Sequence, residues 1–529
     1  MRLSSVFLAI HVLLVNFASA RAEDFSLTIL HINDVHSRIQ AINKYNSTCK
    51  PKEISAGKCF GGMARVKSAI DARRTALKNA GKHVITLDAG DQFQGSLFYT
   101  TYKGSVAVEV MNRIGFDAMA VGNHEFDDGP EALAAFARAA NFPILFANSD
   151  LEKEPQLAAL IKSHIVKTIA GERIAIISVL AEDTDVTSSP GPNVKFLQSE
   201  TVLTSLIQKL EATGVNKIIL LSHVGLKRDQ ELAAKVSGID VIVGGHSHTH
   251  LKTYPKRIDG PDGKSVPIVQ AFAYSKFLGE LEVTWNKDGD VVRAKGKAHL
   301  LDANIKEDVE LASFIKSKAE PFEALRKRVV GHVAEEIDGS SRRCRTGDCP
   351  MGKLIAEAML DRVRSQGIAI AFQHGGGIRA SFSAGKVTMG DVLAALPFQN
   401  TIATFQLQGS DIRAALENGV SQRESRAGRF PQLAGMKFSF LPTAEVGNRV
   451  KDVMVQTVDG SFAPLEADKV YGVVSNNYLR AGGDGYAVFR DKARNVYDFG
   501  PNLGEVLAVY LGKNSPVEPF SDQRITAIK

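Results

Sequence analysis

The sequence is poor in the features that mark non-globular proteins. Glycine accounts for only 45 of 529 residues and no heptad pattern is sustained, which excludes collagen-like and coiled-coil proteins. The chain has no fixed-period repeat and no low-complexity segment. Hydrophobic residues make up 44% of the chain and charged residues 23%, so there is enough apolar material for a core and extensive disorder is excluded. At roughly 150 residues per domain, the length predicts about three domains or two large ones.

A strong excess of one charge is also missing. The 64 lysines and arginines and the 58 acidic residues give a formal net charge of +6, spread without basic clusters. Proteins that bind nucleic-acid polymers usually concentrate basic residues on one face or in runs. We therefore expect no nucleic-acid polymer as a partner.

Long apolar runs are absent after the first twenty residues. Residues 1–20 have a basic start, an apolar stretch at Val6–Phe17 and small residues at Ala18-Ser19-Ala20. This pattern is typical of a cleaved secretory signal peptide, and the apolar stretch is short for a membrane span; an uncleaved anchor is the alternative. The C-terminus is polar and lacks a lipid-anchor tail. We predict a soluble exported protein without a membrane anchor, in a bacterial periplasm or, alternatively, secreted.

The chain has only four cysteines, and they lie in two close pairs. Three pairings are possible, and the spacing favours two local disulfides, Cys49–Cys59 and Cys344–Cys349. A zinc site is the alternative, but these spacings without flanking histidines fit it poorly. The disulfide interpretation agrees with export.

The apolar pattern predicts an α/β protein with two halves. Up to about residue 302, short β-branched runs alternate with amphipathic segments such as Met63–Ala80 and Glu131–Ala140. A charged helical stretch at 307–330, interrupted once by Pro321, is a natural connector, and a second pattern of apolar runs follows it. The predicted strands of the first half are 27–32, 83–87, 118–121, 143–147, 173–180, 217–221 and 241–243; those of the second half are 368–372, 401–407 and 470–474.

Five of the predicted strands run directly into polar residues that can bind metal ions. The carboxyl ends of strands in an α/β sheet are where ligands gather. These ends would bring seven donor side chains to one rim: Asp34, His36, Asp91, Asn123, His223, His246 and His248.

The seven donors predict a site for two metal ions. Asp, Asn and His supply the oxygen and nitrogen atoms that zinc, manganese or iron accept, and seven exceed the needs of one tetrahedral ion. Asp91, in a glycine-flanked turn, is the best candidate for a carboxylate that bridges two ions. Two ions about 3.5–4 Å apart polarise a phosphoryl group and activate water. Taken singly, each feature is more often a turn or surface residue; the spacing also leaves His250 open as a donor.

His124 and Asp127 are candidate catalytic residues beside this site. His124 follows Asn123, and a helical turn would let the Asp127 carboxylate reach back to the imidazole. A histidine held in this way can stabilise a phosphoryl oxygen or protonate a leaving oxygen. The alternative is a capping histidine with an acidic residue in the first helical turn.

These motifs together resemble those of a known enzyme family. Residues 27–38, LTILHINDVHSR, are similar to the opening signature of 5′-nucleotidases in the calcineurin-like metallophosphoesterase superfamily. The later motifs continue the resemblance in order and over nearly the whole mature chain: GD at 90–91, GNHEFD at 122–127, SHVG at 222–225 and GGHSH at 244–248.

The resemblance implies a fold, a domain division and a division of the metal ligands. It implies a four-layer α/β/β/α metallophosphoesterase domain at 21–306 and a nucleotide-binding α/β domain at 332–529, which the residue pattern flanks and joins with a signal peptide at 1–20 and a connecting helix at 307–331. One metal site would use Asp34, His36, Asp91 and His248, and the other Asp91, Asn123, His223 and His246. His124 and Asp127 match the catalytic pair of the family. His248 stands where many members have Gln or Asn.

The same resemblance implies a substrate site in the second half. Residues 374–379, HGGGIR, resemble a family segment in which Arg379 binds phosphate, and Arg345 matches a second such arginine. Tyr478 would stack on the base and Asp484 would bind the ribose, and we expect Phe430 to be the second stacking ring. His374 replaces an asparagine that helps to hold the base in the family.

We therefore predict an exported phosphohydrolase with two divalent cations, zinc or manganese, that acts on nucleoside 5′-monophosphates. The chain would act as a monomer or a homodimer. The nearest alternatives are a UDP-sugar or nucleoside di- and triphosphate hydrolase, and a 2′,3′-cyclic phosphodiesterase with 3′-nucleotidase activity. A catalytically silent nucleotide-binding protein is the alternative outside enzymes, and the complete donor set with His124 and Asp127 argues against it.

Overall fold

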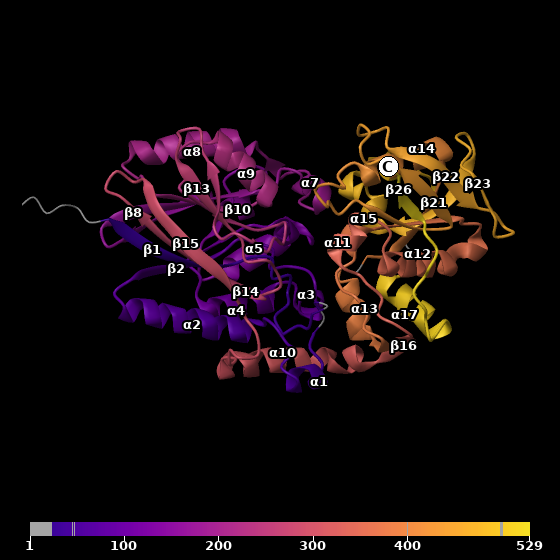
Figure 1. The fold of residues 1–529 in the computed structure, drawn as a ribbon, viewed down its shortest axis with the longest axis horizontal. Helices are drawn as coiled ribbons and strands as arrows, with labels where there is room; N and C mark the ends of the chain where they lie inside the picture. Colours follow the sequence, from indigo (N-terminus) through magenta and orange to yellow (C-terminus); the bar gives the residue numbers. More distant parts are fainter. Residues whose placement is uncertain (1–23, 45, 47, 399, 498–500, 529) are drawn as a thin grey trace, which may run out of the picture.

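The computed structural model describes residues 24–528 except 45, 47, 399 and 498–500. These residues form two lobes joined by one long helix, α10 (Val309–Lys327), which runs along the base of both lobes in Figure 1. Asp308 caps α10 by accepting a hydrogen bond from the Leu311 N–H at 2.8 Å, and the helix continues through Pro321. Within the described ranges, no helix is long and apolar enough to cross a membrane. The predicted signal peptide lies outside them.

Two sheets form the centre of the first lobe. The first sheet has seven strands in the order β15 (Val291–Leu300), β14 (Phe277–Trp285), β1 (Phe25–Ile32), β2 (His83–Asp88), β3 (Ala118–Ala120), β4 (Ile144–Leu145) and β6 (Ile161–Lys162). The second has six, in the order β12 (Lys256–Asp259), β13 (Ser265–Val269), β11 (Val241–Gly244), β10 (Ile218–His223), β8 (Glu172–Leu180) and β7 (His164–Ile169). In the first sheet β1, β2, β3, β4 and β6 are parallel, and the antiparallel strands β14 and β15 lie at one edge. In the second sheet the four inner strands are parallel and both edge strands are antiparallel.

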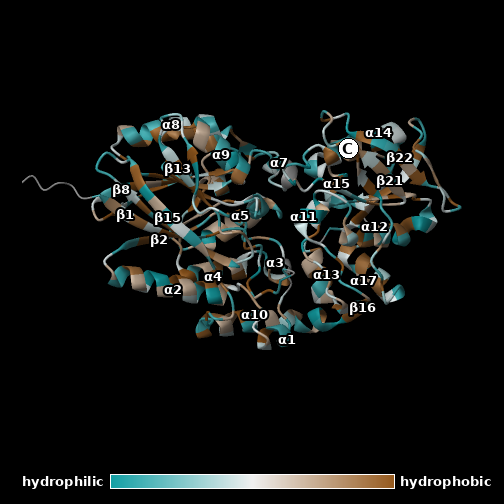
Figure 2. Cartoon of the chain, viewed as in Figure 1, coloured by the Kyte–Doolittle hydropathy of each residue, from teal (hydrophilic) through white to brown (hydrophobic). Residues whose placement is uncertain are grey.

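Apolar side chains bury both faces of each sheet. Leu27 and Ile85 of the first sheet and Ile176 and Val241 of the second share one core between the sheets. The outer faces pack under helices, which Figure 1 places on either side of the two sheets and Figure 2 colours as a mixture of hydrophilic and hydrophobic residues. These helices are α2 (Met63–Asn79), α4 (Ser105–Ile114) and α5 (Pro130–Ala139) on one side and α8 (Ser199–Ala212) and α9 (Leu226–Lys235) on the other. The four-layer α/β/β/α prediction is confirmed, and the double cover explains the continuous apolar runs.

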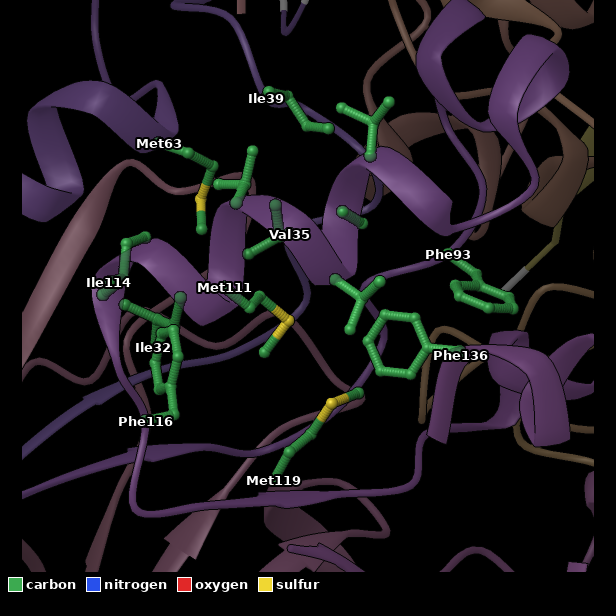
Figure 3. Close-up of a cluster of buried hydrophobic side chains, with 14 of the residues drawn as sticks. Ile32, Val35, Ile39, Met63, Phe93, Met111, Ile114, Phe116, Met119 and Phe136 are labelled. Carbon is green, nitrogen blue, oxygen red and sulfur yellow. The ribbon is translucent and has the colours of Figure 1, made fainter. Parts of the chain in front are cut away.

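One buried cluster anchors the loops that follow β1 and β2. Figure 3 shows Val35, Ile39 and Phe93 packed among side chains of the helix layer and the sheet, such as Met111 and Met119. Val35 lies between two of the predicted metal ligands, and Phe93 lies two residues after a third. Packing of the apolar residues therefore fixes the backbone that carries the donors.

The second lobe is also built on sheets. A five-stranded sheet has the order β20 (Pro431–Ala434), β17 (Ile370–His374), β24 (Val470–Asn476), β19 (Ile402–Gln408) and β25 (Arg494–Tyr497). A four-stranded sheet has the order β23 (Phe462–Pro464), β22 (Val450–Gln456), β21 (Met436–Phe440) and β26 (Ile525–Ala527), and β16 (Val329–Val333) pairs with β18 (Gly385–Thr388). The principal helices are α12 (Pro350–Val363), α13 (Met389–Ala395), α14 (Gly409–Val420) and α17 (Leu503–Lys513).

Short elements complete both lobes. In the first lobe they are α1 (Pro51–Ser55), α3 (Leu97–Tyr102), η1 (Asn123–Phe126), α6 (Pro155–Ala158), α7 (Thr184–Thr187) and the pair β5 (Ser149–Asp150) and β9 (Lys195–Phe196). In the second they are α11 (Ser341–Cys344), η2 (Arg364–Gln366), η3 (Gly375–Gly377), α15 (Asn477–Arg480), η4 (Gly483–Gly485) and α16 (Ala487–Asp491).

A buried carboxyl group in α9 predicts a pH-dependent stability. Asp229 is fully buried and accepts a hydrogen bond from the Ser222 hydroxyl at 2.6 Å; burial raises its pKa to about 7. Between pH 4 and pH 7 the folded chain therefore keeps a proton that the unfolded chain releases. The free energy of unfolding should fall as pH rises through this window, by on the order of 3 kcal/mol for this group.

Urea unfolding of the metal-free protein between pH 4 and pH 8 measures this contribution. We expect the difference in unfolding free energy between wild type and Asp229→Asn to change across the window and to be flat above pH 7. Asp259→Asn, at an exposed position on β12, should unfold in parallel with wild type at every pH. If the unfolding free energies of wild type and Asp229→Asn change with pH in parallel, the prediction is wrong.

Candidate active site

The strand ends bring the predicted donors to one rim. In the first sheet Ile32 lies opposite Asp88, and Asp88 opposite Met119, so β1, β2 and β3 end at the same edge. In the second sheet Ser222 lies opposite Gly244, so β10 and β11 also end together. The donors come from these five ends: Asp34 and His36 after β1, Asp91 after β2, Asn123 after β3, His223 as the last residue of β10, and His246 and His248 after β11.

The seven side chains form two adjoining sets of donor atoms. In the first, His248 Nε2 lies 2.9 Å from His36 Nε2 and 3.2 Å from Asp34 Oδ1. In the second, Asp91 Oδ2 lies 3.1 Å from His223 Nε2. The same Asp91 oxygen lies 3.7 Å from His36 Nε2, which places this carboxylate between the two sets. His246 Nδ1 and Asn123 Oδ1, 3.0 Å apart, complete the second set. His250 lies apart from both sets, against Phe277.

The chemistry of these donors fits divalent cations. His223 Nδ1 donates to the Ala89 carbonyl at 2.5 Å, so its buried Nε2 faces the Asp91 carboxylate at 3.1 Å. Burial opposes a charge on this ring, but Asp91 and Asp34 outweigh it and raise the pKa of His223 to about 10, so a cation that binds here would displace the Nε2 proton. Burial lowers the pKa of His36, His248 and His246, the last to about 4, so these rings are neutral. Imidazole nitrogens that can offer a lone pair, beside two carboxylates, are what a metal ion requires.

Most of the seven donor residues have an unusual backbone conformation. Five of the seven donors have positive φ angles although none is glycine: Asp34 (52°), His36 (48°), Asp91 (61°), His246 (70°) and His248 (49°). Each such residue costs on the order of 1 kcal/mol or more, and such strain is typical of functional sites. The surrounding structure therefore holds these donor residues in a left-handed backbone conformation that their local sequence does not favour.

Glu125 was not singled out from the sequence, although it lies inside the GNHEFD motif. Its buried carboxylate accepts hydrogen bonds from four backbone N–H groups, at 2.7–3.1 Å. The four donors are Gly122, Asp91, Gln92 and Phe93. Glu125 thus ties the turn that carries Asp91 to the turn before Asn123.

His124 and Asp127 are paired beside the donors. His124 Nδ1 lies 2.6 Å from Asp127 Oδ2, and the His124 ring is 5.1 Å from that of His36. Burial opposes the charged imidazole, but the carboxylates of Asp127 and Asp91 outweigh it and raise the pKa of His124. His124 can therefore carry a proton near neutral pH. Phe398 of the second lobe stacks on this ring, with centroids 5.5 Å apart.

Two arginines of the second lobe reach the donor cluster. Arg379 Nη2 lies 3.3 Å from His36 Nε2 and 3.3 Å from the Tyr274 hydroxyl. Arg345 lies near Arg379, and burial together with the charge of Arg379 lowers the pKa of Arg345 to about 10. The buried Nε atom of Arg345 has no hydrogen-bond partner among the described residues. Two guanidinium groups beside a cation site, Arg379 buried and Arg345 half-buried, are suited to bind a phosphate.

The two disulfides are those that the spacing favoured. The structure pairs Cys49 with Cys59 and Cys344 with Cys349. The second pair closes the short loop that contains Arg345, and Gln432 holds this loop by donating to the carbonyls of Cys344 and Gly347 at 2.9 and 2.8 Å.

Three of the predicted nucleoside-binding residues lie together. The rings of His374 and Tyr478 have centroids 5.4 Å apart. Asp484 Oδ1 accepts from the Tyr478 hydroxyl at 3.2 Å, and its Oδ2 lies 3.8 Å from His374 Nε2. Burial lowers the pKa of His374 to about 4, so its ring is neutral and can both stack and hydrogen-bond.

Phe430 is not part of this group. Its side chain has no exposed surface and packs in the hydrophobic core, with its ring centroid 6.0 Å from that of Phe440. The expectation that Phe430 stacks on the base is therefore not supported by this geometry. The ring that faces Tyr478 is that of His374.

Comparison with known proteins agrees with the geometry in both lobes. Residues 27–250 match the calcineurin-like phosphoesterase family, and residues 329–491 match the 5′-nucleotidase, C-terminal domain family. The 5′-nucleotidase of Bos taurus is 35% identical over 533 residues, which cover 95% of this chain and 91% of the relative. The chain belongs to the 5′-nucleotidase family.

Solved structures extend this 5′-nucleotidase assignment. The 5′-nucleotidase precursor from Thermus thermophilus is 37% identical with a TM-score of 0.90, covering 96% of this chain and all of that one. The NAD nucleotidase of Haemophilus influenzae is 27% identical with a TM-score of 0.58, covering 96% of this chain and all of that one. The protein is therefore a metallophosphoesterase-type hydrolase, and its family implies divalent metal ions.

The 5′-nucleotidase site also contains residues that the motifs did not predict. Tyr274, with φ of 60°, donates its N–H to the Asp34 carbonyl at 2.8 Å and presents its hydroxyl to Arg379. Phe398 lies under the Arg379 guanidinium, 5.5 Å from the ring centroid, as well as against His124. No spacing links these residues to the donors, because they reach the site only through tertiary packing.

Proposed function

We propose that this protein hydrolyses nucleoside 5′-monophosphates to a nucleoside and phosphate. The observation that carries the proposal is the position of Arg379, which the second lobe places 3.3 Å from the metal-donor nitrogen of His36. A phosphate bound by Arg379 and Arg345 would lie against the donor cluster. The nucleoside would then extend toward His374, Tyr478 and Asp484.

We propose that two divalent cations, zinc or manganese, bind at the donor cluster. Their ligands would be Asp34, His36, Asp91 and His248 for one ion, and Asp91, Asn123, His223 and His246 for the other. Cations bound here would polarise the phosphoryl group and lower the pKa of water that attacks phosphorus.

The side chains of the protein have separate tasks in this reaction. Arg345 and Arg379 orient the phosphate and offset its charge. His124, held by Asp127, stabilises the charge that develops on the phosphoryl group or gives its proton to the departing 5′-oxygen.

We also propose the organisation that the sequence indicated. Residues 1–20 would be removed on export to the periplasm, 21–306 would form the catalytic domain, 307–331 the connecting helix and 332–529 the nucleotide-binding domain. The position of α10 between the lobes supports this division.

Phosphate release by the purified mature protein tests the proposed function. The substrates are AMP, UMP, 3′-AMP, 2′,3′-cyclic AMP, ATP, UDP-glucose and NAD, each with Zn²⁺, Mn²⁺, Mg²⁺ or EDTA. We expect AMP and UMP to dominate, EDTA to abolish turnover and Zn²⁺ or Mn²⁺ to restore it. His374→Asn should change the ratio of AMP to UMP turnover. Preference for UDP-glucose, NAD or the cyclic ester would contradict the 5′-monophosphate proposal.

A further inference from the structure

Among the described residues, the carboxylate of Asp127 bonds to two side chains, and only one of them is the catalytic histidine. Its Oδ2 lies 2.6 Å from His124 Nδ1, while its Oδ1 accepts a hydrogen bond from the Ser188 hydroxyl at 2.7 Å. Hydrogen bonds therefore connect Ser188 through Asp127 to His124, which lies beside the donor cluster. Ser188 belongs to none of the sequence motifs that indicated the site.

A series of hydrogen bonds connects the backbone around Ser188 to the candidate metal site. The Ser188 N–H donates to the Thr184 carbonyl at 3.0 Å, and the hydroxyl of the fully buried Thr184 donates to the Ala181 carbonyl at 2.7 Å. The Ala181 N–H in turn donates to the carbonyl of His223, the last residue of β10, at 3.1 Å. The Ser188 hydroxyl therefore has a fixed position relative to the strand that carries a candidate ligand.

We propose that Ser188 is a positioning residue that acts on catalysis through Asp127. A carboxylate with a single partner can rotate about its Cβ–Cγ bond, and the imidazole that it holds can rotate with it. The second hydrogen bond fixes the plane of the carboxylate, so that Oδ2 holds His124 Nδ1 and the other ring nitrogen faces the reacting phosphate. This inference rests on the catalytic role of His124 in the proposed function.

A purely structural role for Ser188 must be separated from this one. Ser188 directly follows α7, and α7 contacts η4 of the second lobe, so a change here could also disturb the interface between the lobes. A double-mutant cycle distinguishes the two roles, because a residue that acts through His124 has no effect once the imidazole is absent.

The experiment compares AMP hydrolysis by wild type, Ser188→Ala, His124→Ala and the double variant, with Ser188→Thr and Ser189→Ala as controls. We expect Ser188→Ala to lower kcat about 10-fold with KM within about 2-fold, because the lost bond involves a charged carboxylate. In the His124→Ala background the same change should alter kcat less than about 2-fold. Threonine keeps the hydroxyl and should restore most of kcat, and Ser189→Ala, at the exposed neighbouring position, should match wild type.

Three results would overturn the inference. Wild-type kcat in Ser188→Ala would show that the bond does not matter. An equal loss in both backgrounds, or a rise in KM instead of a fall in kcat, would show that Ser188 acts through the fold or the interface. If His124→Ala itself keeps near-wild-type kcat, the catalytic role of His124 in the proposed function fails and the inference falls with it.

Discussion

Replacement of Asp91 by asparagine is expected to reduce bound metal from two ions to one or fewer and to lower kcat/KM for AMP by about three orders of magnitude. Asp91 Oδ2 lies between the two donor sets, 3.1 Å from His223 Nε2 and 3.7 Å from His36 Nε2. Burial raises the pKa of this carboxyl group, but the neighbouring histidines outweigh burial and hold the pKa well below its usual range. The side chain is therefore an anion that both cations would share.

Asparagine tests the charge of Asp91 with little change of shape. The Asn carbonyl oxygen can still accept the hydrogen bond that Asp91 Oδ1 takes from the His124 N–H at 3.0 Å. Metal content by elemental analysis and phosphate release from AMP are the two measurements. Asp128→Asn is the matched control, since Asp128 binds Tyr99 and Lys103 away from the donors. A variant that keeps two ions and wild-type activity would exclude Asp91 as the bridging ligand.

Replacement of His124 by alanine is expected to lower kcat by about 10²- to 10⁴-fold while leaving two metal ions bound. The imidazole is held by Asp127 at 2.6 Å and its pKa is raised, so it carries the proton or charge that the transition state needs. The effect should fall on kcat more than on KM, because the interaction strengthens as charge develops on the phosphoryl group.

Measurement of the bound metal distinguishes this catalytic role of His124 from a role as a metal ligand. The ligand atoms of His36, Asp91 and His124 lie close enough together to hold an ion, so loss of metal in His124→Ala would identify His124 as a ligand instead. Added imidazole should restore part of kcat if the alanine variant leaves an imidazole-sized space. His164→Ala, on the edge strand β7, is the matched histidine control and should behave as wild type.

The first-lobe donors could be predicted because strand pattern and chemistry coincide there. An apolar run predicts a strand, and an Asp, Asn or His at the end of that run is predicted to lie at the carboxyl edge of the sheet, where ligands bind. The structure brings all seven donors together at the ends of β1, β2, β3, β10 and β11. Their positive φ angles were not predictable, since nothing in the local sequence requires Asp34 or His248 to be left-handed.

The second lobe was less predictable because its motifs are short and their residue types are ambiguous. Arg379 is a surface charge by pattern alone, yet it is buried against Tyr274 and His36. Phe430 was expected at the base site and lies in the core against Phe440. A phenylalanine near a glycine-rich turn is equally compatible with both places, and only the packing of the surrounding sheets separates them.

The sequence by itself determined the α/β class, the family, and the candidate metal donors with their order along the chain. These follow from local patterns, since periodicity assigns strands and the residue at each strand end assigns the chemistry. Only the tertiary structure decided that Arg379 and Phe398 meet His36 and His124, that Glu125 ties two ligand turns together and that Ser188 supports Asp127. Such contacts join segments far apart in the chain, or depend on side-chain direction, and both are fixed by long-range packing that no short motif encodes.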